Sequence, residues 1–422
     1  MTQLSNDCFA HTGRLMPVGE ALERLERTVA QVTEAESVPV AAALGRVLAE
    51  DVIPAHDVPP HDNTAVDGYA VRFDDLAPDR ETSLPVIGRV AAGQPLDGPA
   101  PAGAAVRIFT GAPMPEGADT VFMQEDCRRE GERVILPPGI ARGANRRRRG
   151  EDLTAGRAAL RAGRRLRPQD LSQAAAAGRR EVMVSCRLRV ALMSTGDELR
   201  TPGAPLDPGC IYDSNRFIAH GLLAGLGCAV SDLGIVEDRV ETVCAALAAA
   251  ARENDLIITS GGVSVGEEDH VKPAVESLGA LHIWRLAIKP GRPIALGQVG
   301  RVPFVGLPGN PVAAMITFLI LVRPMILRLM GARDVIPRRF SVRADFAYKK
   351  KAGRREWLRA RLEPDRDAPG SYGWRAVKFP LDGSGILTSM VDSDGLIELS
   401  EDVTRVRPGD VVEYLPFSEV CS

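Results

Sequence analysis

The sequence predicts a multidomain protein of mixed α/β and β type, built around one doubly wound α/β domain. Three observations support this prediction. At 422 residues the chain is longer than a single hydrophobic core, which rarely exceeds about 250–300 residues. Between residues 185 and 334, apolar strands alternate with amphipathic helices, a pattern typical of a parallel sheet covered on both sides. On either side of this region, short β-prone runs lie between Gly and Pro turns.

The α/β domain is predicted from an alternation of apolar runs and helical periodicity. Pro324 should kink or split the long helix that follows Pro311, because proline cannot donate the intrahelical hydrogen bond. The predicted strands are residues 188–193, 229–236, 255–259, 282–287, 294–296 and 302–306, and the predicted helices are 214–226, 240–251, 269–278 and the segment after Pro311.

The N-terminal part is predicted to form a discontinuous helical platform from residues 14–51 and 140–184, interrupted by an inserted β-rich lobe at 52–139. Apolar residues at helical spacing predict helices at 18–32 and 44–50. Pro168 and Gly178 are start and stop signals for an alanine-rich helix between them. The β-prone runs of the lobe are residues 84–90, 104–109, 120–124 and 133–136.

Residues 335–422 are predicted to form a second small β domain that resembles a barrel. Its β-prone runs are residues 357–362, 374–378, 395–399 and 410–414.

Charge and cysteine content exclude several classes of function. The net charge of −3 gives no overall attraction to nucleic acid or to an anionic membrane. The seven cysteines contain no CxxC pair, which favours a reduced chain over a disulfide framework or a zinc site. The N-terminus shows no signal peptide, and the apolar run at 312–322 is shorter than the ~20 residues of a membrane span. A cytoplasmic protein is expected.

Three loops follow predicted strands of the α/β domain: residues 194–198, 260–269 and 307–311. Ligands of parallel sheets bind beyond the carboxyl ends of the strands, where such loops meet. The second loop contains Gly261, Gly262 and Gly266 with Ser260 and Ser264, so its backbone amides could face an anion. A tight turn without a ligand is the alternative for this loop taken by itself.

Carboxylates lie beside this predicted anion site. Glu198, Asp238 and Asp269 each follow a strand, and carboxylates next to phosphates call for a divalent cation such as Mg²⁺ between them. Each could instead cap a helix or lie in a solvated turn. Lys289, with Arg285 and Arg292, could bind an oxyanion or belong to an ordinary solvated loop.

The remaining polar segments are ambiguous by themselves. Pro308 and Pro311 should stiffen a turn in which Asn310 can cap the next helix. The segments 62–70 and 108–115 read as turns, and Arg146–Arg149 as a solvated face that could also contact an anionic substrate. The histidines show no metal-binding spacing, and no HExxH, Walker A or GxGxxG pattern is present.

Eight segments taken together resemble the molybdopterin molybdenumtransferase family, the bacterial relatives of the gephyrin E domain. The resemblance runs from about Pro17 to the C-terminus in the same order and spacing. The segments are residues 62–70 (DNTAVDGYA), 110–115 (TGAPMP), 145–152, 194–199 (STGDEL), 211–216 (IYDSNR), 260–266 (SGGVSVG), 286–291 (LAIKPG) and 306–312 (GLPGNPV).

This resemblance implies an elongated four-part protomer and a homodimer. It also implies that adenylylated molybdopterin and molybdate meet on the α/β domain, where molybdenum is inserted and AMP is released with the help of Mg²⁺. The residues that match catalytic positions of the family are Asp67, Thr110, Asp152, Glu198, Asp238, Asp269, Lys289, Pro308 and Pro311. The expected substrate-binding residues are Thr195, Gly196, Asp197, Ser260, Gly261, Gly262, Ser264, Gly309 and Asn310, and the expected metal ligands are Glu198 and Asp269.

By the same resemblance, Asp67 and Thr110 would reach the site from the other subunit. His270 departs from the family, which has an aromatic residue such as tyrosine there, and residues 383–389 are similar to a serine-rich turn of the family. A molybdopterin adenylyltransferase is the nearest alternative, but that family is usually a lone α/β domain. A scaffold role like that of gephyrin is a further alternative, but the sequence lacks the long disordered linker that would suit such a role. The adenylyltransferase and recipient molybdoenzymes are possible partners.

Overall fold

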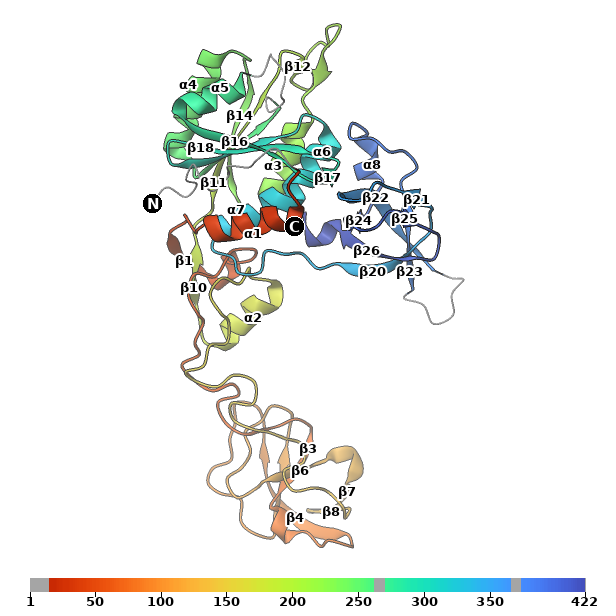
Figure 1. Cartoon of the computed structure of the whole chain (residues 1–422). Helices are drawn as coiled ribbons and strands as arrows, with labels where there is room; N and C mark the ends of the chain where they lie inside the picture. Colours follow the sequence, from red (N-terminus) through yellow and green to blue (C-terminus); the bar gives the residue numbers. More distant parts are fainter. Residues whose placement is uncertain (1–14, 262–269, 366–372, 422) are drawn as a thin grey trace.

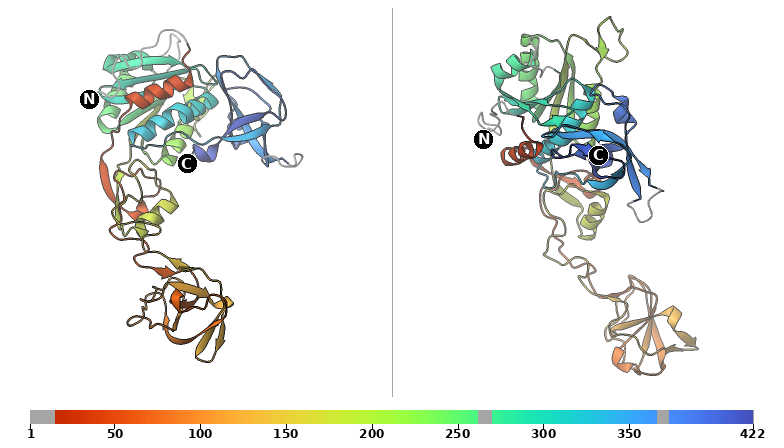
Figure 2. Two further views of the ribbon diagram at one scale, coloured as in Figure 1. Left: turned by 60° about the horizontal axis from the view of Figure 1, so that its bottom comes forward. Right: turned by 45° about the vertical axis from the view of Figure 1, so that its right-hand side comes forward.

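The computed structural model describes residues 15–261, 270–365 and 373–421. The protein is elongated (Figures 1 and 2). The α/β domain and the C-terminal β domain lie side by side at one end, and the inserted β lobe lies at the other. A narrow middle part that contains helix α2 (Pro168–Ala176) joins them.

The α/β domain contains a six-stranded sheet in the order β14-β11-β15-β19-β18-β16. The first four strands are parallel, whereas β18 runs antiparallel to both of its neighbours. The expected purely parallel sheet is therefore mixed, because the two residues between β18 and β19 are too few for a crossover connection. The strands are β11 (Arg189–Thr195), β14 (Ala229–Val236), β15 (Leu256–Ser260), β16 (Gly279–Arg285), β18 (Pro293–Val299) and β19 (Val302–Leu307).

Helices cover both faces of this sheet, as the sequence predicted. Helices α4 (Val240–Glu253) and α5 (Val271–Leu278) pack on one face through residues such as Leu247 and Val275. The other face packs against α3 (Asn215–Gly225), α6 (Pro311–Thr317) and α7 (Arg323–Leu329), and the same core includes α1 (Val18–Thr28).

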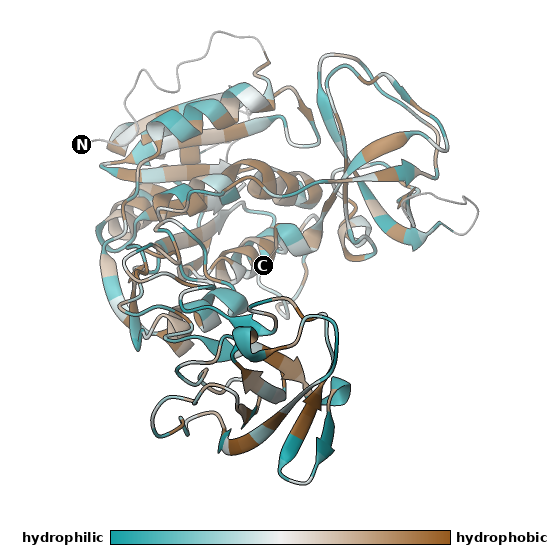
Figure 3. Cartoon of the chain, turned by 90° about the horizontal axis from the view of Figure 1, so that it is seen from below, coloured by the Kyte–Doolittle hydropathy of each residue, from teal (hydrophilic) through white to brown (hydrophobic). Residues whose placement is uncertain are grey.

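The long helix after Pro311 is divided at the place that Pro324 predicts. Between α6 and α7, residues Phe318–Val322 form a π-helical turn, which accommodates the missing N–H of the proline. The whole stretch Pro311–Leu329 has the length and apolar composition of a membrane-spanning helix. However, 89% of its most apolar window is buried in the protein, so this stretch is a core helix. Figure 3 shows its hydrophobic ribbon against the sheet.

The platform is built from both sides of the insertion. Strand β1 (Ala35–Pro39) pairs antiparallel with β10 (Glu181–Ser185), more than 140 residues later in the chain. The helix predicted at 44–50 is wrong: Val47 and Leu48 form β-bridges to Arg165 and Val184. Val47 and Leu48 are buried in two different cores, and the φ of 74° at Gly45 lies outside the helical range.

The inserted lobe is a six-stranded sheet in the order β6-β3-β5-β4-β8-β7, with one small apolar core on each face. A two-stranded ribbon, β2 (Asn63–Thr64) with β9 (Arg146–Arg147), lies where the chain enters and leaves. The strands of the sheet are β3 (Gly68–Val71), β4 (Thr82–Val90), β5 (Ala105–Ile108), β6 (Thr120–Met123), β7 (Arg128–Glu130) and β8 (Arg133–Leu136).

The C-terminal domain is a closed five-stranded barrel in the order β22-β23-β20-β26-β24, and β24 pairs with β22 to close it. One strand of the α/β domain, β17 (Ile288–Lys289), adds to the outside of β22. The barrel strands are β20 (Phe340–Ala344), β22 (Arg355–Pro364), β23 (Trp374–Lys378), β24 (Gly395–Leu399) and β26 (Val411–Pro416), with the small pair β21 (Tyr348–Lys349) and β25 (Arg405–Val406) and helix α8 (Thr388–Val391).

Candidate functional site

The carboxyl ends of four parallel strands form one edge of the α/β sheet. In register, Thr195 lies beside Val236, Ser194 beside Ser260, and Ser260 beside Leu307. The loops that follow β14, β11, β15 and β19 therefore lie next to one another. The predicted meeting of the three loops at one edge is confirmed for their described residues.

Gly261 is the contact point between these loops. Its N–H donates to the carbonyl of Leu307 at 3.3 Å, and a Cβ atom at this position would lie 2.9 Å from the carbonyl oxygen of Thr195. Its φ of 86° is also one that other residues rarely adopt. Only glycine therefore fits between the first and third loops. Gly262, Ser264 and Asp269 of the same loop lie outside the described residues.

The first loop begins with two buried hydroxyl groups. Thr195 is 3% exposed and Ser194 is fully buried, and neither hydroxyl has a hydrogen-bond partner within the described residues. Beyond them, Asp197 and Glu198 are exposed. A Cβ at Gly196 would lie 2.6 Å from the carboxylate of Glu198, so this carboxylate folds back over the loop. A buried hydroxyl without a partner is costly, and of these two only Thr195 is the last residue of β11, next to the loop where a ligand would bind.

The third loop is held by helix α3. The side-chain amide of Asn215 donates to the carbonyl of Gly309 at 2.7 Å. Pro308 is buried, whereas Gly309 and Asn310 are exposed. Asn310 occupies the N-cap position of the next helix, as predicted, but its side chain makes no capping hydrogen bond. Instead, the N–H of Val312 donates to the carbonyl of Ser384, from the serine-rich turn of the C-terminal domain, at 3.0 Å.

Of the two candidate metal ligands, Glu198 lies among the described residues and Asp269 does not. Glu198 and Asp238 follow the neighbouring strands β11 and β14. Within the described residues, no group of three or more His, Cys, Asp or Glu side chains is arranged to hold a metal ion. The metal site expected from Glu198 and Asp269 thus depends on a residue outside that part of the chain. His270, which departs from the family, directly precedes α5.

Lys289 lies at the junction between the α/β domain and the barrel. Its ammonium donates to the hydroxyl of Tyr348 at 3.1 Å and lies 3.6 Å from the buried carboxylate of Glu356. Partial burial lowers the pKa of Lys289, but the hydrogen bond to Tyr348 and the nearby negative charges outweigh this effect and raise the pKa overall. The lysine lines a cavity of 380 Å³ together with Tyr348, Glu356, Arg359, Asp382 and Ser384.

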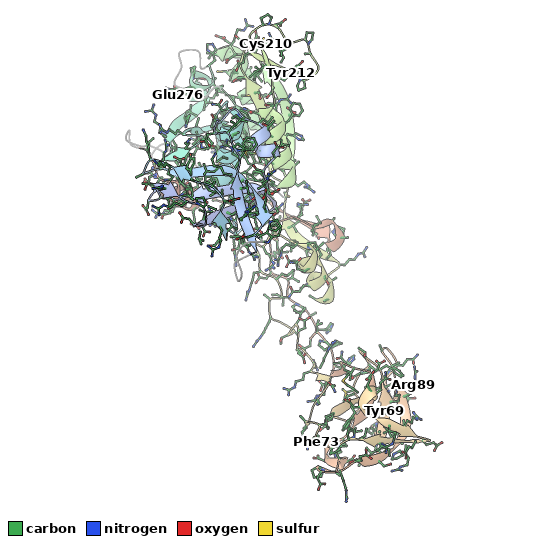
Figure 4. All side chains as sticks on the ribbon, turned by 90° about the vertical axis from the view of Figure 1, so that its right-hand side faces the viewer. Tyr69, Phe73, Arg89, Cys210, Tyr212 and Glu276 are labelled. Carbon is green, nitrogen blue, oxygen red and sulfur yellow. The ribbon has the colours of Figure 1, made fainter. Side chains whose placement is uncertain are left out.

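Asp67 and Thr110 lie together, but in the inserted lobe. The backbone N–H and the hydroxyl of Thr110 both donate to Oδ1 of Asp67 at 2.7 Å. The hydrogen bond from the backbone N–H of Thr110 and, second in importance, that from its hydroxyl lower the pKa of Asp67. In Figure 4, Tyr69 of the same lobe lies at the opposite end of the molecule from Tyr212 of the α/β domain. The pair therefore does not reach the α/β edge of its own chain.

Two further predictions concern the region between lobe and platform. Asp152 is exposed, and its N–H donates to the carbonyl of Val58 at 3.0 Å. In the arginine run, Arg149 pairs with Asp57 at 2.6 Å and Arg146 with Asp62 at 3.5 Å. For Arg146 and Arg149, these ion pairs within the protein favour the interpretation without a substrate contact.

Sequence reasoning did not identify several groups that contact the site. Asn215 lies in the 211–216 motif, but its contact with Gly309 could not be foreseen. Tyr348 and Glu356 are separated from Lys289 by 59 and 67 residues, and no local pattern marks them. The carbonyl of Ser384 is a backbone group, so its role depends on tertiary structure alone.

Comparisons with known proteins agree with this arrangement. Three family models match consecutive parts of the chain: the MoeA N-terminal region (domains I and II) over residues 16–178, a probable molybdopterin binding domain over 191–328, and the MoeA C-terminal region (domain IV) over 341–417. A molybdopterin biosynthesis moeA protein from Pyrococcus horikoshii has a similar structure, with a TM-score of 0.80 and 30% identity, and the match covers 96% of this chain and 100% of that one.

Curated relatives extend over nearly the whole chain. Molybdopterin molybdenumtransferase of Haemophilus influenzae is 38% identical over 408 residues, which cover 96% of this chain and 100% of the relative. Molybdopterin molybdenumtransferase 2 of Mycobacterium tuberculosis is 35% identical over 408 residues, which cover 92% of this chain and 97% of the relative. The loops at the sheet edge, the inserted lobe and the barrel thus belong to one pattern, and the chain is a member of the molybdopterin molybdenumtransferase family.

Proposed function

We propose that this protein inserts molybdenum from molybdate into adenylylated molybdopterin, with hydrolysis of the adenylate and release of AMP. The observation that carries this proposal is the edge formed by the loops after β11, β15 and β19. Lys289 lines a nearby cavity whose lining includes Ser384, and Ser384 accepts a hydrogen bond from Val312 at the start of α6. The hydroxyl of Thr195, which has no partner within the described residues, the ammonium of Lys289 and the backbone amides proposed for the glycine loop suit ligands that are anions. Both the phosphoanhydride and molybdate are such ligands.

In this proposal the chain contributes binding and orientation. We expect amides of the glycine loop beyond Gly261 to hold the phosphates, the hydroxyl of Thr195 to donate to one of their oxygens, and Lys289 to balance the negative charge. Hydrolysis adds one water molecule across the phosphoanhydride and gives AMP and the phosphate of the pterin. Mg²⁺ held by Glu198 and Asp269 would polarise that anhydride. Asp238, Pro308, Pro311 and Asp152 are proposed to complete the site.

The proposed active unit is a homodimer. Asp67 and Thr110 match catalytic positions of the family, but they lie at the other end of the chain from the α/β edge. A second copy, placed with its lobe over this edge, would bring them to the substrate. We expect the protein to act in the cytoplasm, where the molybdopterin adenylyltransferase could supply its substrate and molybdoenzymes could receive its product.

The decisive experiment supplies purified protein with Mg²⁺, molybdate and adenylylated molybdopterin. We expect AMP release and a product that activates a cofactor-free molybdoenzyme. Asp269→Asn and Glu198→Gln should abolish both while leaving the protein folded and dimeric. Glu237→Gln is the matched control, because this exposed carboxylate at the same edge pairs with Arg239 at 3.0 Å. Synthesis of the adenylate from ATP by the wild-type protein would instead support an adenylyltransferase.

A further inference from the structure

We propose that Glu356 and Tyr348 of the C-terminal barrel are positioning residues that hold the ammonium of Lys289 in place in the cavity between the α/β domain and the barrel. This inference rests on the proposed function for the role of Lys289 toward an anionic substrate. It gives the barrel a part in the reaction that does not depend on direct contact between Glu356 or Tyr348 and the substrate.

Strand pairing brings the three residues together. The short strand β17 leaves the α/β domain and pairs in parallel with β22 of the barrel, which places Lys289 beside Glu356 in register. Tyr348, on β21, completes the group: its hydroxyl donates to Oε2 of Glu356 at 2.8 Å and accepts from Lys289 at 3.1 Å. The same ammonium lies 3.6 Å from Oε2. A hydrogen-bonded chain thus runs from the barrel to Lys289.

Glu356 is the more deeply buried residue of its ion pair with Lys289. Its side chain is fully buried, whereas that of Lys289 is 43% exposed. Oε1 of Glu356 accepts a hydrogen bond from Arg354 at 2.6 Å, so that each carboxylate oxygen has a partner. A buried carboxylate is destabilising unless it is paired and hydrogen-bonded. The carboxylate is therefore fixed, and the lysine is the part of the group that faces solvent and the cavity.

Two other cations near this group are held by different partners of the barrel. Lys378 pairs with Asp382 at 2.8 Å and lies over the ring of Tyr348. Arg359 is bound to Ser389 at 3.0 Å and to the carbonyl of Gly383 at 3.1 Å. Both of these cations are thus engaged within the barrel, whereas Lys289 is linked to the barrel from the α/β side.

A lysine side chain is a flexible stem with a point charge, so its position must be set by its surroundings. A charge that is already in place when the substrate binds costs no ordering at that moment. Glu356 and Tyr348 supply this ordering, and together with Asp382 they keep the amine protonated against the effect of partial burial.

The first test measures Lys289 itself and does not depend on activity. Only the neutral amine reacts with acetic anhydride, so the labelling rate of Lys289, read by mass spectrometry at about pH 8.5, reports its protonation. We expect Tyr348→Phe and Glu356→Gln to raise this rate by about tenfold, because each removes a group that holds the pKa of Lys289 above its ordinary value. The exposed Lys351 of the same barrel is the internal reference.

Matched controls separate this effect from general loosening of the barrel. Glu398→Gln removes another buried barrel carboxylate, one that pairs with Arg339 and Arg355 and not with lysine. Tyr414→Phe removes a buried hydroxyl that donates to the carbonyl of Ala360. Neither should change the labelling of Lys289. An unchanged rate in folded Tyr348→Phe, or an equal rise in the controls, would overturn the inference.

The second test uses the dependence of AMP release on molybdate and pH. Tyr348→Phe should raise KM for the anionic substrates about tenfold at pH values above the ordinary lysine pKa of about 10.4 and much less near neutral pH, with little change in kcat. Glu356→Asp should raise KM less than Glu356→Gln does if the carboxylate acts on Lys289. A wild-type protein without AMP release would contradict the proposed function alone, since the labelling experiment would still decide the positioning role.

Discussion

One carboxylate oxygen of Asp67 accepts two hydrogen bonds from the same residue, Thr110, each at 2.7 Å. These bonds cross from the start of β3 to the residues after β5 and fix the carboxylate on the surface of the inserted lobe. They also favour its charged form and so lower the pKa of Asp67. The lobe thus presents an anionic, pre-oriented group far from the α/β edge of its own chain.

Thr110→Ala should raise the pKa of Asp67, because the hydroxyl hydrogen bond to the charged form is lost while the backbone bond remains. A raised pKa means that Asp67 keeps its proton up to a higher pH, so the acidic limb of the activity profile should move to higher pH. Carboxyl-carbon NMR titration of Asp67 measures the shift directly. Thr82→Ala is the control, since Thr82 accepts from Ala77 elsewhere in the lobe; an equal shift in both variants would argue against the role of Thr110.

Two inactive variants should complement each other if the active site is shared between subunits. Asp67→Asn and Lys289→Gln, co-expressed and purified together, should recover about one quarter of the wild-type activity, because random pairing leaves one intact site in half of the dimers. Glu198→Gln with Lys289→Gln should recover none, since both residues belong to the same α/β domain. Absence of recovery in the first mixture, with mixed dimers present, would refute the shared site.

Thr195→Val should separate binding from stability. The buried hydroxyl of Thr195 has no partner in the described part of the chain, so a methyl group of similar size should leave the free energy of unfolding unchanged or raise it by up to about 1 kcal/mol. If this hydroxyl binds substrate, kcat/KM for AMP release should fall about tenfold. Thr259→Val, one residue inside β15, removes a similarly buried hydroxyl that has no partner within the described residues, and it should leave kcat/KM unchanged.

Asp170 should make the stability of the platform depend on pH. Burial raises the pKa of this carboxyl, but hydrogen bonds from Arg167 and Arg164 outweigh burial and lower the pKa to about 2. Because the pKa is lower in the folded state, the stabilisation is complete above the ordinary value of 3.8 and is lost as pH falls toward about 2.

Asp170→Asn should therefore lower the free energy of unfolding by about 1–2 kcal/mol at neutral pH and remove much of the dependence between about pH 4 and 2. Urea unfolding followed through the platform measures both effects. Asp51→Asn, at a partly exposed carboxylate that pairs with the exposed Arg161, should have a much smaller effect. Equal effects of the two substitutions would contradict the importance of burial at Asp170.

Local patterns predicted most of the elements that position the site. The strand 229–236 and the strand 133–136 were predicted with the bounds that the structure shows. The prediction of a helix at 44–50 was wrong. The spacing of Leu44, Val47 and Leu48 fits a helix, but Val47 and Leu48 pair with distant segments of the chain that the local pattern does not show. The direction of β18 also escaped prediction, since a strand has the same apolar pattern in either direction.

The sequence by itself determined the α/β alternation, the positions of the loops after the strands, and the residues in them that suit an anion. It could do so because these features depend on periodicity and on residues close together in the chain. Tertiary structure alone decided that Ser384 caps α6, that Glu356 and Tyr348 hold Lys289, and that Asp67 lies away from its own α/β edge. These relationships join residues tens or hundreds of positions apart, and only the packing of complete domains brings such residues within reach of a hydrogen bond or keeps them apart.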